Sequence, residues 1–134
     1  MSKDMKIRWG WLKFMYIFTI VVAGGFGLGI IFIPNVLISM FKMPEQDPIV
    51  SGVMGSVFLA FGILSIFGLR SPLKFVPILL LQLCYKLIWV LGVILPLRFV
   101  GQLQMYGILF VVIFAIYIAG DLIAIPFHYL FAKQ

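Results

Sequence analysis

Ionisable side chains are scarce in this sequence, and their scarcity excludes most catalytic mechanisms. Of the 134 residues 10% are charged, with four acids and a single histidine in total. One histidine and four scattered acids do not make a metal site of standard spacing. No arrangement of serine, histidine and acid for nucleophilic catalysis is visible either. We therefore assign no catalytic residue and no metal ligand, and we do not expect an enzyme.

Cysteine is almost absent, since Cys84 is the only one, and this excludes an intrachain disulfide. A cleavable signal sequence is not indicated. The first residues are basic, but the apolar run after them continues to Ile33 with no small-residue cleavage site. This pattern is typical of a first span that is retained in the membrane.

Apolar residues are abundant instead, at 64% of the chain. A soluble fold of this size leaves much of its surface in water, so this much apolar surface needs lipid as its solvent. About 20 apolar residues cross a bilayer, and the length allows four such helices in one transmembrane domain, residues 1–134. The sequence predicts an all-α integral membrane four-helix bundle with spans at about 12–33, 49–69, 73–96 and 105–126.

A short amphipathic helix is predicted at about 35–43, in the interface between spans one and two, and Pro44 is expected to close it. Asp47 is the predicted N-cap of the second span, with Pro48 at the first helical position. In the third span, Pro77 is expected to kink the first third and Pro96 to close the helix.

Glycines in the first two spans predict close helix packing. Gly25 and Gly29 form a GxxxG pair, a spacing that lets a neighbouring helix approach closely. Gly52, Gly55 and Ser56 of the second span are expected to pack against the glycines of the first.

The basic residues predict an orientation, because cytoplasmic loops carry an excess of lysine and arginine. With both termini inside, seven basic residues are cytoplasmic and two are outside. The seven are Lys3, Lys6, Arg8, Lys13, Arg70, Lys74 and Lys133, and the two are Lys42 and Arg98. We therefore predict a plasma or inner membrane protein with both termini in the cytoplasm.

Lys86 is the most unusual residue of the sequence. It lies twelve residues from Lys74 and twelve from Arg98, about 18 Å from each on a helix. A bilayer core is about 30 Å thick, so its ammonium would lie near the centre, where a charge is costly. Gln82 and Trp89 share its helix face, and Tyr85 adjoins it. We interpret these four residues as a candidate ligand-binding face.

A structural role for Lys86 is the alternative, and what it faces is left open between backbone carbonyls, Tyr117, water and a ligand. Asp121 is the only acid inside a predicted span, but ideal helices place it about two turns away in height. We therefore favour an ion pair of Asp121 with Arg70 or Lys74. A proton relay through Asp121 and Lys86 is the less favoured alternative.

The layout resembles the DoxX/DoxD-like group of small four-span membrane proteins. The resemblance is carried by the glycines of the first span, the proline-bounded segment Pro34–Pro44, Gly52 and Gly55 in the second span, and the compact hairpin of spans three and four. Some members of that group are accessory subunits of thiol- or quinone-linked membrane oxidoreductases. The resemblance therefore implies a redox partner.

Three functions remain open. The first is a non-enzymatic accessory or interaction subunit, and the second is a quinone- or lipid-binding subunit of a membrane oxidoreductase. The third is a small oligomeric transporter. The expected partners are the bilayer and other membrane subunits or further copies of the chain. Nucleic acid is not expected, because the net charge of +6 follows from the basic flanks of the spans. No cofactor is assigned beyond the quinone of the second function.

Overall fold

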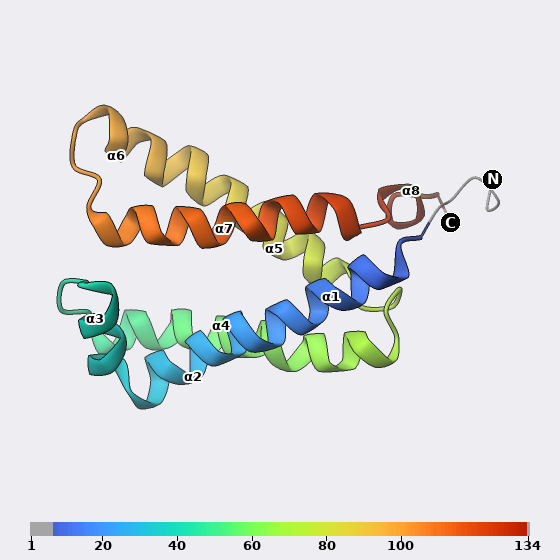
Figure 1. Ribbon diagram of the computed structural model, residues 1–134, viewed down its shortest axis with the longest axis horizontal. Helices are drawn as coiled ribbons and strands as arrows, with labels where there is room; N and C mark the ends of the chain where they lie inside the picture. The colour runs from blue at the N-terminus through green and yellow to red at the C-terminus, as the bar shows by residue number, and fades with distance from the viewer. Residues whose placement is uncertain (1–6, 134) are drawn as a thin grey trace.

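The computed structural model describes residues 7–133, and all regular structure in that range is helical (Figure 1). Four helical segments are long and apolar enough to cross a membrane. The predicted all-α membrane bundle is therefore confirmed. Lys3 and Lys6, which enter the charge count, lie outside the described residues.

The first long segment consists of α1 (Trp9–Thr19), the π-helix η2 (Ile20–Gly24) and α2 (Gly25–Phe32). The second is α4 (Pro48–Arg70), and the fourth is α7 (Met105–Ala124). The third consists of α5 (Val76–Trp89), the π-helix η3 (Val90–Ile94) and α6 (Leu95–Phe99). Two short helices complete the chain, α3 (Pro34–Phe41) between the first two segments and α8 (Phe127–Leu130) at the C-terminal end.

The prolines of the third segment do not act as the sequence predicts. Pro77 lies in the first turn of α5, so there is no preceding helix for it to kink. Pro96 does not close the segment, which continues to Phe99. The π-helix immediately before it is an irregular turn, and such turns accommodate a proline that an ideal α-helix would reject.

Asp47 caps α4 as predicted, and the cap yields a first test. Its Oδ2 accepts the backbone N–H of Val50 at 3.1 Å, and Pro48 follows in the first turn. Because Asp47→Ala removes this acceptor, we expect a loss of about 1 kcal/mol in unfolding free energy. Asp47→Asn retains an acceptor and is the control. Thermal unfolding in detergent measures both, and equal losses would contradict the capping role.

The bundle consists of two helical hairpins that diverge along its length. In the first hairpin α1, η2 and α2 pack along α4, and in the second α5 packs on α7. Figure 1 places both termini and the α4–α5 turn at one end, the termini end, and α3 with the α6–α7 connection at the other, the loop end. The hairpins join where α1 packs on α7, and they separate toward the loop end.

Close packing is concentrated in the termini half. The main cluster of buried apolar residues comprises Leu12, Met15, Tyr16, Val76, Leu79, Leu83, Tyr117, Ala124 and Ile125. These come from the parts of α1, α5 and α7 nearest the termini end, and from the residue after α7. Large apolar side chains such as Phe32 and Ile88 remain exposed on the outside, as lipid-facing positions require.

Glycines hold the first hairpin together, but the predicted pair is wrong in part. A Cβ on Gly27 would lie 2.6 Å from the Gly55 oxygen, and one on Gly62 would lie 2.7 Å from the Gly24 Cα. Gly25, by contrast, has open space around it, and so does Gly52. Gly25 and Gly29 both lie in α2, but the face of α2 that meets α4 carries Gly27, and Gly29 meets Leu37 of α3 instead.

Candidate functional site

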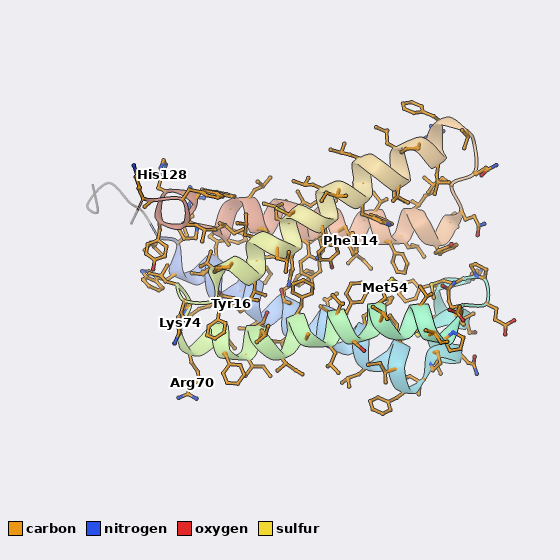
Figure 2. The ribbon with its side chains drawn as sticks, turned by 180° about the vertical axis from the view of Figure 1, so that it is seen from behind. Tyr16, Met54, Arg70, Lys74, Phe114 and His128 are labelled. Atoms are coloured by element: carbon orange, nitrogen blue, oxygen red, sulfur yellow. The ribbon has the colours of Figure 1, made fainter. Side chains whose placement is uncertain are left out.

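A cavity of about 1350 Å³ lies between the two hairpins in the loop half of the bundle. Its walls come from α2, α3 and α4 on one side and from α5, η3, α6 and α7 on the other. Figure 2 labels one residue of each wall, Met54 of the first hairpin and Phe114 of the second. Gln46, Gln102 and Gln104 lie at the loop end of this cavity, and aliphatic and aromatic side chains line most of the rest.

Lys86 lies at the inner end of the cavity and is 1% exposed. Its Nζ lies over three aromatic rings, 4.1 Å from the ring centre of Tyr117, 4.3 Å from that of Tyr85 and 4.9 Å from that of Phe114. The ammonium also donates a hydrogen bond of 3.0 Å to the Tyr85 hydroxyl. An ammonium over aromatic faces is stabilised by the ring quadrupoles, more so where water is excluded. This aromatic cage is what makes the lysine tolerable at this depth.

The structure divides the four predicted ligand-binding residues between two places. Tyr85 and Trp89 line the cavity with Lys86, and the Trp89 ring meets that of Phe114 at 4.9 Å. Gln82 does not line the cavity. It is fully buried one turn closer to the termini end, on the same helix.

Beneath the cage lies a second group of buried polar residues, which we call the polar layer: Thr19, Gln82, Tyr117 and Asp121. Thr19 Oγ1 donates to the Met15 carbonyl at 2.7 Å and lies 3.4 Å from Gln82 Oε1. Four atoms in the layer have no hydrogen-bond partner among the described residues: Gln82 Nε2, the Tyr117 hydroxyl and both Asp121 carboxyl oxygens. Buried polar atoms are rarely left unpaired, so each of these needs an explanation.

Asp121 does not form the predicted ion pair. Arg70 and Lys74 are both exposed at the termini end (Figure 2), and neither hydrogen-bonds to the Asp121 carboxylate. The predicted offset between Lys86 and Asp121 depends on a third span that ends at Pro96, which sets the depth of Lys86. The helix continues for three more residues to Phe99, which puts Lys86 about 4.5 Å farther from the loop end and closer in depth to Asp121.

Helix register therefore brings the acid and the lysine within one turn of each other. The antiparallel helices α5 and α7 place the Lys86 Nζ over the Tyr117 ring. One turn closer to the termini end, the same helix faces carry Gln82 and Asp121. Lys86 and Asp121 thus belong to one buried region, although they lie beyond hydrogen-bonding distance.

Two residues of the site had not been identified from the sequence. Thr19 had a signal, since it is the only threonine of the chain and lies in the middle of an apolar run. Phe114 had none, because it is one of 14 phenylalanines and only the tertiary packing selects it.

No protein-family model, curated protein or solved structure matches this chain. The resemblance to the DoxX/DoxD-like group stays a prediction, and the function has to be argued from the cavity and the polar layer.

Proposed function

We propose that this small membrane protein binds a lipophilic ligand in the cavity, with the polar head of the ligand at Lys86. One observation supports the proposal: among the described residues that line the cavity, Lys86 is the only charged one, and it lies at the inner end. A largely apolar cavity with a few convergent polar groups is the usual form of a small-molecule site.

The chemistry of the inner end limits the head group. A lysine ammonium has three donors and no acceptor, and Tyr85 uses one donor here. The head group is therefore a hydrogen-bond acceptor, such as a carboxylate, a phosphate or a quinone carbonyl. Ordinary ligand pockets measure about 300–1000 Å³, so a cavity of about 1350 Å³ has room for a long chain as well as a head.

This proposal selects the ligand-binding function from the three that the sequence leaves open. A transporter is less favoured, because the cavity ends at Lys86 and the termini half beyond it is closely packed. An accessory role is compatible with ligand binding, since a subunit that holds a quinone or lipid can serve a membrane oxidoreductase or a further copy of itself. The charge asymmetry of the sequence predicts that the loop end, and with it the cavity, lies in the outer half of the membrane.

Filling the cavity tests the proposal. Val53 lines the cavity and Ile63 does not, although both lie on α4 and both are about half exposed or more. We expect Val53→Trp to lose most of the lipid or quinone that co-purifies with the wild type, because the indole occupies its space. Ile63→Trp is the matched control and should retain it. Native mass spectrometry in mild detergent measures both, and equal ligand content in the two variants would contradict the proposal.

A further inference from the structure

The charges around the cavity are arranged asymmetrically. Lys86 lines its inner end, and among the described residues no acid lines it. Asp121 is fully buried behind the lysine, one turn closer to the termini end. Because Lys86 lines the cavity and Asp121 lies behind it, a ligand in the cavity meets the ammonium first. Such a site favours an anionic head group over a neutral one.

The cost of net charge constrains this buried region. An uncompensated charge in a low-dielectric interior costs several kcal/mol or more, and both Asp121 oxygens lack a hydrogen-bond partner among residues 7–133. Without a ligand, an ammonium on Lys86 and a carboxylate on Asp121 sum to zero. When a ligand carboxylate enters, the sum becomes minus one unless a proton enters with it.

Other groups near Asp121 do not supply the missing positive charge. Tyr85 on α5 lies near this acid, and Gln82 and Thr19 belong to the same polar layer. The hydroxyl of Tyr16 on α1 donates to the Pro72 carbonyl at 2.6 Å. Arg8 reaches the Ile123 carbonyl at 2.8 Å, but its side chain is exposed at the termini end. Lys86 is the buried cation of the region.

We propose, resting on the ligand-binding function above, that the cavity takes up a fatty-acid-type carboxylate together with one proton. Lys86 holds the carboxylate, and Asp121 carries the proton. No bond of the ligand breaks, and the proton comes from water. The bound state contains a ligand carboxylate, an ammonium and a neutral carboxyl group, which again sum to zero. The Tyr117 ring lies 4.1 Å from the Lys86 ammonium, and Tyr117 is one turn from Asp121 on α7, so this side chain adjoins both groups.

Calorimetry with oleate tests the proposal. Oleate is titrated into the protein in lipid nanodiscs, in two buffers of different ionisation enthalpy at one pH, with empty nanodiscs subtracted. Wild-type protein should take up about one proton for each oleate bound, and Asp121→Asn should bind oleate with none. Methyl oleate has the same chain without the charge, and its binding should take up no proton. Asp47→Asn, which removes an acid outside the spans and keeps the helix cap, should behave as the wild type.

Infrared difference spectroscopy supplies a second readout on the wild type alone. Adding oleate labelled with ¹³C at its carboxyl carbon, whose own band is shifted, should produce the unshifted C=O stretching band of a buried protonated carboxyl group of the protein. This readout does not depend on how much protein Asp121→Asn yields. Oleate binding without proton uptake and without this band would overturn the proposal. If oleate does not bind but a neutral lipid or quinone does, the acidic ligand is wrong and the binding function stands. If no lipophile binds, both fail.

Discussion

Lys86→Met is expected to abolish head-group binding while leaving the bundle folded. Methionine is close to lysine in length but has no donor, so the acceptor head of a ligand would be buried without a partner. Removing one partner of a buried, hydrogen-bonded charge pair costs about 2 to 5 kcal/mol of affinity, which is a 30-fold or larger rise in Kd. Ligand content of the purified protein, measured by native mass spectrometry, is the readout.

The thermal stability of Lys86→Met distinguishes a loss of ligand binding from a folding defect. No acid loses a hydrogen bond in the variant, because the ammonium bonds to the Tyr85 hydroxyl, and among the described residues both Asp121 oxygens are already unpaired. Asp121 does lose the cation that balances its charge, so its carboxyl group has to take up a proton to become neutral, and removing one charge of a buried pair is destabilising. We therefore expect a lower melting temperature in detergent at neutral pH, and a smaller difference from the wild type as the pH falls.

A matched control and a contrary outcome complete this experiment. Lys74→Met removes an exposed lysine at the termini end (Figure 2) and should change neither ligand content nor melting temperature. Unchanged ligand content in Lys86→Met would show that Lys86 does not take part in ligand binding. The absence of a cooperative unfolding transition would show that Lys86 is needed for the fold instead.

Composition and spacing were sufficient to predict the class of protein and its most unusual residue. Lipid is the only solvent that suits this apolar content, so the four-helix membrane bundle followed from length and hydropathy. The burial of Lys86 followed from its distance to the flanking charges, which depends on helical rise alone. These properties depend on single helices, so they can be predicted from the sequence without knowing how the helices pack.

Properties that depend on two helices were predicted less well. The offset between Lys86 and Asp121 changes by about a turn if a segment ends three residues later, and Pro96 gave no sign that a π-helix would let the segment continue. The cavity depends on the divergence of the two hairpins, which arises from packing at the termini end. Neither the register nor the divergence has a local sequence signal.

The glycine contacts of the first hairpin show the same limit, and they provide the second large prediction. The four-residue spacing of Gly25 and Gly29 predicted a close helix contact at Gly25, but a Cβ on Gly25 would meet nothing within 4 Å. At Gly27 a Cβ would lie 2.6 Å from the backbone oxygen of Gly55 and 2.6 Å from the backbone nitrogen of Leu59. Backbone atoms of a helix cannot move aside as a side chain can, so α2 and α4 would have to separate.

Gly27→Ala and Gly25→Ala should therefore change stability in opposite directions, although they lie two residues apart on one helix. Overpacking at Gly27 is expected to cost about 1 to 3 kcal/mol. At Gly25 the substitution meets open space, and the better helix propensity of alanine favours folding by up to about 1 kcal/mol. Thermal unfolding in the same detergent compares the two variants with the wild type. Similar melting temperatures for both would mean that α2 and α4 do not pack through Gly27. A lower value for Gly27→Ala alone would locate the contact that holds the first wall of the cavity in place.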